Sequence, residues 1–517
     1  MHKYLYVTVF VSGLTTLAVE MAASRLLGSV FGTSNLVWAS IIGLILIYLA
    51  AGYFLGGYWA DRSPTFRTFY KILVWASVGI VIVPVIARPI LQLAANAFDH
   101  LEIGILAGSF GSVLVLLVIP MILLGTASPF AIRLAVQDGK TVGSVSGKIY
   151  ATSTIGSFIG TFLPVLLLIP TIGTHRTFLV SGSFLLLIAL AGLWLYAGWK
   201  AVIPYLWTLV LIPALFVWGL PGGTKNTTGQ VYETESAYNY IQVLEQDGYT
   251  LLRLNEGQGI HSIYHPDKTN YFGPWEQVLV APFFNPAPYP LEQVKRLAII
   301  GLAAGTTARE ASLVYDAIEI DGYEIDPEIV RVGRLYFDMN EPNLNVIVQD
   351  GRWGLEHSPY QYQIISIDAY RPPYIPFHLT TQEFFQIARR HLTNNGVMVI
   401  NVGRAPNDRR LINALGSTIL TVFPTIHVVD IPNTFNSMLF ATVQPTTADN
   451  FLENLLYLSR AQSTPSLLLD TMKITAANLQ KPPEAGPVFT DDKAPVEWIT
   501  NNMVLSFLFS GEMENLE

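Results

Sequence analysis

The sequence contains no cysteine, which excludes disulfide bonds, thiolate zinc sites and cysteine nucleophiles. Charged residues are also scarce: they make up 13% of the 517 residues, against about 25% in ordinary soluble domains. The formal net charge is −8 and no basic run is present, so we expect no nucleic-acid partner. With 51% hydrophobic residues and a mean hydropathy of +0.41, the composition is wrong for an ordinary soluble enzyme.

The apolar residues concentrate in residues 1–220, for which we predict a polytopic α-helical membrane bundle. A helix needs about 20 apolar residues to cross a bilayer. Seven segments meet that length, over residues 4–24, 36–60, 70–97, 103–124, 148–170, 177–197 and 201–220. Small residues at four-residue spacing, as in Gly52/Gly56 and Gly156/Gly160, would let these helices pack closely.

Basic residues in the short loops indicate the orientation of the bundle. By the positive-inside rule they place the N-terminus in the cytoplasm. The residues concerned are Arg62, Arg67, Lys71, Arg133, Lys140, Lys148 and Lys200. Seven helices would then place the C-terminal half outside, unless one segment is misjudged. The stretch 70–97, broken at Arg88-Pro89, is the segment least certain to be a single span.

Glu20 and Arg25 lie in or beside the first span, where they either fix the packing or line a ligand path.

The second half of the chain alternates between strands and helices. Residues 221–229 have the composition of a linker, and short alternating runs in residues 230–290 predict a small antiparallel sheet. Residues 291–517 predict a Rossmann-like α/β domain with a parallel, doubly wound sheet. Its strands are expected at residues 297–300, 317–320, 345–348, 363–367 and 396–401. Ligands in such sheets bind at the carboxyl ends of the strands.

A turn of small residues follows the first of these strands, from Gly301 to Gly305. Small side chains let a ligand approach the backbone, and the helix that follows offers free N–H groups. A tight turn without a ligand would have the same sequence, so this turn alone does not decide between the two.

Three acidic residues end the next three strands. Glu324 comes 23 residues after Gly301, a spacing at which a carboxylate can accept both hydroxyls of a ribose. Asp350, ahead of Gly351, is placed to accept from an adenine amine, although an Asp-Gly turn is the alternative. Asp368 faces the position of the reacting end of the ligand. Three acids without a Walker sequence suit a neutral or cationic nucleoside and do not suit a pyrophosphate.

The motifs of the second half, taken in order, resemble the spermidine synthase (polyamine aminopropyltransferase) family, which has a class-I methyltransferase-like fold. The resemblance covers roughly residues 230–500. It rests on Glu235-Ser-Ala-Tyr-Asn, Tyr323-Glu-Ile-Asp-Pro, Gln349-Asp-Gly-Arg, Ile367-Asp-Ala-Tyr, His378-Leu-Thr-Thr-Gln-Glu-Phe and Thr490-Asp-Asp-Lys-Ala-Pro-Val-Glu. The stretch from Gly13 to Gly32 resembles bacterial membrane proteins with a fused spermidine synthase domain.

This resemblance implies transfer of an aminopropyl group from decarboxylated S-adenosylmethionine, a co-substrate, to an amine, with no metal and no permanently bound cofactor. Asp368 would take a proton from the attacking amine. The residues implied to bind the donor are Asn239, Gly301, Gly305, Glu324, Asp350 and Gly351, and those implied to bind the amine are Glu276 and Tyr370. It also implies a homodimer in the inner (plasma) membrane with the enzyme domain in the cytoplasm, where adenosyl donors are made.

The sequence departs from the family where the polyamine would bind. Ala304 replaces the acid that would pair with the ammonium of the donor, and Arg371 replaces a second acid near Asp368. Of the acidic run aligned with residues 270–276, only Glu276 is kept. Two alternatives to an aminopropyltransferase therefore stay open. One is a methyltransferase-like enzyme that uses intact S-adenosylmethionine, and the other is a polyamine transporter or sensor with a non-catalytic nucleoside-binding domain.

Overall fold

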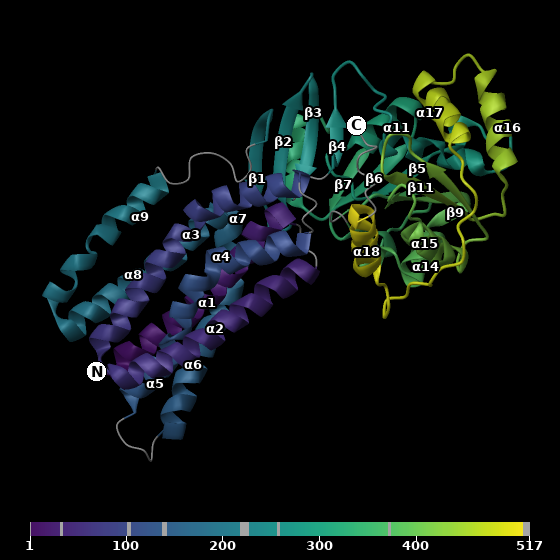
Figure 1. Cartoon of the computed structure of the whole chain (residues 1–517). Helices are drawn as coiled ribbons and strands as arrows, with labels where there is room; N and C mark the ends of the chain where they lie inside the picture. The colour runs from purple at the N-terminus through teal and green to yellow at the C-terminus, as the bar shows by residue number, and fades with distance from the viewer. Residues whose placement is uncertain are drawn as a thin grey trace. The chain divides into compact units, whose positions relative to one another are not determined.

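The computed structural model describes residues 2–31, 35–100, 105–136, 142–217, 227–255, 259–370 and 374–509. The chain forms two compact units. The first comprises Met1–Thr227 with Glu233–Tyr240, and the second comprises Thr228–Tyr232 with Ile241–Glu517. Figure 1 shows helices throughout the first unit and a mixture of strands and helices in the second.

The first unit is a helical bundle. Its main helices are α1 (His2–Phe31), α2 (Asn35–Arg62), α3 (Phe66–His100), α4 (Ile105–Gly125), α5 (Ala127–Ala135), α6 (Val142–Leu163) and α8 (Thr174–Ala197). Six helical spans among the described residues are long and apolar enough to cross a bilayer. They run over Lys3–Gly28, Val37–Arg62, Phe66–Ala87, Gly111–Ala135, Val142–Ile172 and Thr174–Ala197. These spans overlap the first six predicted segments.

The seventh predicted segment, residues 201–220, does not form one long helix within its described part. Two 3₁₀ turns, Trp199–Ala201 and Ile203–Tyr205, precede α9 (Trp207–Val217), which has 11 residues. Pro204 lies in the second turn and restricts the backbone there. The predicted break at Arg88-Pro89 is absent from the described chain, because α3 continues through it.

Small residues allow the helices of the bundle to approach closely, as predicted. A Cβ atom on Gly156 or Gly160 of α6 would lie 2.0 Å from the carbonyl oxygen of Phe10 or 2.1 Å from that of Leu14 in α1. Gly52 of α2 meets α4 in the same way. Arg25 donates hydrogen bonds to the backbone carbonyls of Ser236 and Tyr238, which belong to the same compact unit. These contacts are of the kind that fixes packing, and a role of Arg25 on a ligand path stays a prediction.

The small antiparallel sheet is present. Its strands are β1 (Gln230–Glu235), β2 (Tyr240–Gln246), β3 (Tyr249–Leu254) and β4 (Ser262–Tyr264), in that spatial order. The loop from β2 to β3 is Asp247-Gly248, with φ of 51° and 83°. Two residues with positive φ match the twist of a tight hairpin, and Asp-Gly is a preferred pair there.

The large sheet of the second unit has seven strands among the described residues, in the order β10-β11-β9-β8-β5-β6-β7. They are β5 (Arg296–Ile300), β6 (Glu319–Glu324), β7 (Leu344–Val348), β8 (Tyr362–Ile367), β9 (Leu392–Gly403), β10 (Thr425–Asp430) and β11 (Asn436–Thr442). β5 to β9 are parallel, whereas β10 and β11 pair antiparallel at one edge. The predicted Rossmann-like fold is confirmed, with two antiparallel strands, β10 and β11, that the sequence pattern did not predict.

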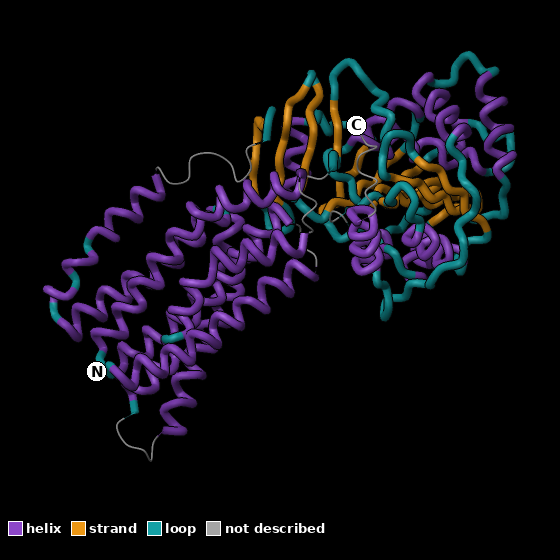
Figure 2. Tube along the Cα trace, viewed as in Figure 1, coloured by secondary structure: helices purple, strands orange, loops and turns teal. Residues whose placement is uncertain are grey.

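Helices cover both faces of this sheet, as Figure 2 shows. They are α10 (Pro274–Gln277), α11 (Thr306–Val314), α12 (Pro327–Tyr336), α13 (Gly351–Glu356), α14 (Gln382–Arg390), α15 (Arg410–Leu420), α16 (Ala448–Ser459), α17 (Ser466–Ala477) and α18 (Val496–Phe509). The strand order reverses at β5, which pairs with β6 on one side and β8 on the other. Ligands of open α/β sheets bind at such a switch point, so the carboxyl ends of β5 and β8 are where the site is expected.

Candidate functional site

A cavity of about 890 Å³ opens at the carboxyl ends of β5, β8 and β9. Gly301 to Ala303, Asp368 with Tyr370, and Asn401 line it from these three strands. The other walls come from residues 259–263, residues 271–275, residues 403–406, residues 434–436, the start of α11, and Thr500 and Met503 of α18. The cavity therefore lies at the switch point, where the sequence predicted it.

The turn after β5 requires its glycines for close packing. Gly301 has a φ of +90°, and a Cβ atom there would lie 2.6 Å from the carbonyl oxygen of Asp368. Gly305 has a φ of +87° and would meet the side chain of Met339 at 2.6 Å. Of these two glycines, Gly301 lines the cavity and Gly305 does not. Gly305 is the N-terminal cap of α11 and faces Met339. A donor-binding role of Gly305 stays a prediction.

Glu324 ends β6 and is buried. One carboxylate oxygen accepts a hydrogen bond from the N–H of Ala303 at 3.0 Å, and the other accepts from the N–H of Asp326 at 3.0 Å. Burial raises the pKa of Glu324 to about 7, although the backbone hydrogen bonds act in the opposite direction. Glu324 thus fixes the turn after β5. Since each carboxylate oxygen can accept a second hydrogen bond, the predicted ribose contact is compatible with this arrangement.

Asp350 follows β7 and caps α13. One carboxylate oxygen accepts from the N–H of Trp353 at 3.0 Å, and the other lies 3.1 Å from the Nε2 atom of His378. The hydrogen bond from His378 lowers the pKa of Asp350. Gly351 packs on β5, since a Cβ atom there would lie 2.4 Å from Ile300. The sequence did not predict the pairing with His378, and the adenine contact of Asp350 stays a prediction.

Asp368 follows β8 and lines the cavity. Its Oδ1 atom accepts a hydrogen bond of 2.9 Å from the amide of Asn401, and the Oδ1 atom of Asn401 accepts one of 2.9 Å from Asn436. Tyr370 donates to the backbone carbonyl of Asn401 at 3.0 Å. Burial raises the pKa of Asp368 to about 6, against the effect of the Asn401 hydrogen bond. The result is a carboxylate on a rigid support, facing the cavity, with a pKa close to neutrality.

Asn401 and Asn436 were not among the predicted site residues. Asn401 ends the expected fifth strand, beside the strand of Asp368, so its position was a signal that the sequence offered. Asn436 reaches the site through the antiparallel pairing of β11 with β9, in which Asn436 pairs with Gly403. No local pattern predicts that pairing.

Glu276 is buried and shapes the loop that forms one wall of the cavity. Its carboxylate accepts hydrogen bonds from the backbone N–H groups of Tyr271 and Gly273, the latter at 3.0 Å. Glu310 of α11 is buried beside it, and burial with the nearby Glu276 raises the pKa of Glu310 well above its ordinary value. Tyr271 and Gly273 line the cavity, whereas Glu276 is not among the described lining residues. Its predicted contact with the amine stays a prediction.

Besides Gly305 and Glu276, four predicted donor-binding residues are not among the described residues that line this cavity: Asn239, Glu324, Asp350 and Gly351. Asn239 belongs to the first compact unit, where its carbonyl accepts from the N–H of Ser236 at 2.9 Å, and its role toward the donor stays a prediction. Arg371 lies outside the described residues.

His261 and Thr500 add polar atoms to the cavity that the sequence did not predict. The Nε2 atom of His261 and the Oγ1 atom of Thr500 are buried and have no hydrogen-bond partner among the described residues. Burial lowers the pKa of His261 to about 4, so its ring is neutral at physiological pH. Neither residue therefore adds charge to the cavity wall.

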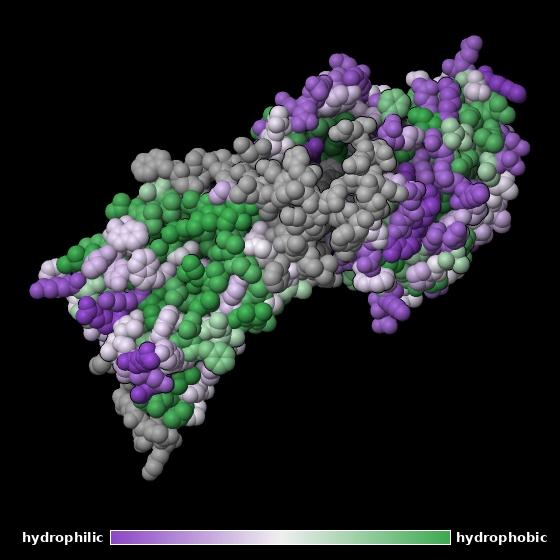
Figure 3. Space-filling view, viewed as in Figure 1, coloured by the Kyte–Doolittle hydropathy of each residue, from purple (hydrophilic) through white to green (hydrophobic). Residues whose placement is uncertain are grey.

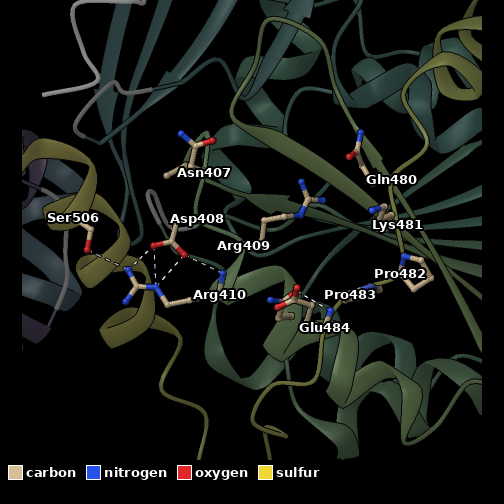
Figure 4. Close-up of a pocket in the computed structure, with 12 residues that line it drawn as sticks. Asn407, Asp408, Arg409, Arg410, Gln480, Lys481, Pro482, Pro483, Glu484 and Ser506 are labelled. Carbon is tan, nitrogen blue, oxygen red and sulfur yellow. Dashed lines mark hydrogen bonds and ion pairs between the residues drawn. The ribbon is translucent and has the colours of Figure 1, made fainter. Parts of the chain in front are cut away.

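A second cavity, of about 770 Å³, lies beside α15 and is shown in Figure 4. Three of its charged groups take part in ion pairs: Asp408, Arg409 and Arg410. Arg410 pairs with Asp408 at 2.5 Å and contacts Ser506, while Arg409 binds Asp430 at 2.8 Å. The carboxylate of Asp408 is thus already paired, whereas Asp368 has no ion-pair partner among the described residues.

The fold and the position of the cavity define a class-I methyltransferase-like domain. Residues 287–454 match the family described as the spermine/spermidine synthase domain, so the predicted resemblance to the spermidine synthase family is confirmed.

Two curated relatives agree with this family match. The chain is 33% identical over 284 residues to a probable polyamine aminopropyl transferase of Bifidobacterium longum, covering 52% of this chain and 62% of the relative. It is 30% identical over 183 residues to a polyamine aminopropyltransferase of Vibrio vulnificus, covering 33% and 58%. The chain thus spans about three fifths of the length of these relatives. A solved spermidine synthase in complex with the transition state analogue AdoDATO is 20% identical, with coverage of 49% and 84% and a TM-score of 0.40.

Proposed function

We propose that this protein is a membrane-bound aminopropyltransferase that moves the aminopropyl group of decarboxylated S-adenosylmethionine to an amine. The observation that carries the proposal is Asp368, a cavity carboxylate at the switch point with a pKa of about 6. Its relatives of known name are polyamine aminopropyltransferases, which makes a transferase the best-supported class of enzyme.

The proposed reaction is a displacement at carbon. An ammonium is not a nucleophile, so the amine must lose a proton, and Asp368 is the base that faces it. The amine nitrogen forms a bond to the propyl carbon while the bond from that carbon to sulfur breaks. The sulfonium leaves as the neutral thioether 5′-methylthioadenosine, and the proton goes to Asp368. Most of the remaining acceleration would come from holding nitrogen, carbon and sulfur in line.

The donor would extend from Asp368 along the neighbouring strand ends. Glu324, at the end of β6, is proposed to accept from the ribose hydroxyls, and Asp350, after β7, from the adenine amine. The order β8-β5-β6-β7 puts these acids in the sequence in which the three parts of the donor follow one another.

The helical bundle is proposed to hold the enzyme in the plasma membrane with its active domain in the cytoplasm. Six spans would return the chain to the side of its N-terminus, which the loop charges assign to the cytoplasm. A reporter fused to the C-terminus tests this. Activity of a cytoplasmic reporter supports the orientation, and activity of a periplasmic reporter contradicts it.

We also propose a homodimer, from the resemblance alone. Light scattering on the detergent-solubilised protein tests it.

The transfer itself is tested with the full chain purified in detergent. Incubation with decarboxylated S-adenosylmethionine and a panel of amines should release 5′-methylthioadenosine, measured by chromatography, together with an amine heavier by one aminopropyl group. Reactions without amine provide the control. Absence of both products with every amine would refute the proposal.

One observation favours a second candidate, a methyltransferase-like enzyme that uses intact S-adenosylmethionine. Ala304 is buried and its N–H donates to Ser262 at 2.9 Å, so no acid is present there to bind the ammonium of the decarboxylated donor. Calorimetry with the two donors separates the candidates. Tighter binding of the intact donor would favour the methyltransferase, and tighter binding of the decarboxylated donor would favour the aminopropyltransferase.

A further inference from the structure

The charges that face the cavity are few. Among its described lining residues, Asp368 is the only carboxylate and Arg404 the only guanidinium. His261 is the one histidine among these described lining residues, and its lowered pKa keeps the ring neutral. In the proposed reaction the donor already brings a sulfonium and an ammonium. Asp368 therefore already faces the two cationic groups of the donor. A diamine acceptor would add a further ammonium group.

Arg404 makes the far side of the cavity less favourable to cations. Its Nε atom lies 3.6 Å from Asp430, but Asp430 is held more closely by Arg409, at 2.8 Å and 3.2 Å. One carboxylate thus lies between two guanidinium groups, which leaves a positive charge beside the cavity. Arg404 is 14% exposed, so solvent screens that charge only weakly.

The rest of the wall is largely apolar and aromatic. The apolar side chains come from four segments that are separate in the sequence and that the fold brings together around the cavity. They are Ile260, Ile263, Phe272, Trp275, Phe435 and Met503. Phe272 is 64% exposed and Phe435 44% exposed, so both present ring surface that a ligand can cover.

We propose that the acceptor is a primary monoamine with an apolar body, and that diamines and polyamines are poor substrates. This inference rests on the proposed aminopropyl transfer. Among the described lining residues, a second ammonium would find no further carboxylate partner and would lie close to Arg404, which is unfavourable. An alkyl or aryl body would instead cover Phe272 and Phe435 and gain by leaving water.

The test uses three amines of matched length that differ only at the far end: pentylamine, 1,4-diaminobutane and 5-aminopentanoate. These end in a methyl, an ammonium and a carboxylate group. Release of 5′-methylthioadenosine by the full chain is measured with each. We expect kcat/KM for pentylamine to exceed that for 1,4-diaminobutane by about tenfold or more. Arg404 can pair with the carboxylate of 5-aminopentanoate, so this amine should also be used better than 1,4-diaminobutane. Equal or better use of 1,4-diaminobutane would overturn the inference, while the proposed transfer would stand.

A designed change should reverse this preference. Phe272 has a φ of 57°, a conformation that Asp and Asn adopt more readily than other residues, so Phe272→Asp and Phe272→Asn should both fold. The aspartate should raise the kcat/KM ratio of 1,4-diaminobutane to pentylamine several-fold, and the uncharged asparagine should not. An equal rise in both variants, or in neither, counts against the inference.

If no amine is turned over, the proposed transfer fails and the cavity is tested by binding. Calorimetry with 5′-methylthioadenosine present should then show tighter binding of pentylamine than of 1,4-diaminobutane. The opposite order would overturn the inference independently of catalysis.

Discussion

Both compact units bury apolar cores, and they differ in what they expose and in the polar groups they enclose. In the bundle, large apolar side chains such as Phe54 and Leu166 are 83% and 72% exposed, and Figure 3 shows hydrophobic residues covering much of its visible face. In the second unit, acidic and amide groups lie inside, as in the chain of hydrogen bonds from Asp368 through Asn401 to Asn436. An apolar exterior needs a lipid environment, whereas an interior polar network needs every member to be paired. The first unit therefore suits an anchor, and the second a site.

The largest effect is expected from Asp368→Asn, which tests the polar interior directly. The asparagine keeps a group that can accept from Asn401 but cannot take a proton, so kcat should fall by about 10²–10⁴-fold. The unfolding temperature should not fall, because the raised pKa shows that the folded state disfavours the ionised carboxylate at neutral pH. Asp408→Asn, in the second cavity, is the matched control, and this variant should keep the kcat of the parent protein. Near-normal activity of Asp368→Asn would remove its role as the base.

Close backbone contacts exist in both units, and two glycine substitutions compare them. Gly301→Ala places a Cβ atom 2.7 Å from the backbone of Ala369 at a φ of +90°, and Gly156→Ala places one 2.0 Å from Phe10. Each should destabilise its own unit by about 1–3 kcal/mol. Calorimetric unfolding in detergent measures this, with Gly57→Ala, whose Cβ atom would meet nothing within 4 Å, as the control. If both variants shift one common transition, the two units do not unfold separately.

The strand-end acids could be predicted from the sequence because each depends on a local pattern. A short apolar run ends at Glu324, Asp350 and Asp368, and parallel strands bring those ends together. The contribution of Asn436 depends on the antiparallel return of β11, and that of Thr500 on the packing of α18, both of which join distant segments. No periodicity within either segment contains that information.

The bundle shows the same limit. Composition predicted a helix in each of the first six segments, because apolar length is a local property. In the last segment, composition could not show that the chain forms 3₁₀ turns around Pro204 before α9 begins. The number of spans, and with it the side of the membrane proposed for the site, depends on that local break.

A smaller effect is expected on the pH dependence of activity, which tests how the buried hydrogen bonds of the second unit control the pKa of Asp368. The base must be ionised, so activity should be lost as the pH falls through about 6, the pKa of Asp368. The hydrogen bond from Asn401 favours the ionised form, so Asn401→Ala should move this limb to higher pH by about one unit. A pH profile of kcat/KM measures both. A loss of activity in Asn401→Ala with an unmoved limb would show that Asn401 acts only on the structure.

The smallest effect is expected from Glu20→Gln, which tests whether the bundle is only an anchor. Glu20 lies in the first apolar span, and a transporter or sensor would use its charge, whereas an anchor would not. On the anchor hypothesis, release of 5′-methylthioadenosine and uptake of labelled amine into cells should both match the parent protein within about twofold. Because glutamine keeps the length and hydrogen-bonding capacity of the side chain, a loss of uptake with normal transfer would assign the bundle a transport function. The two units would then differ in activity as well as in the side chains they expose.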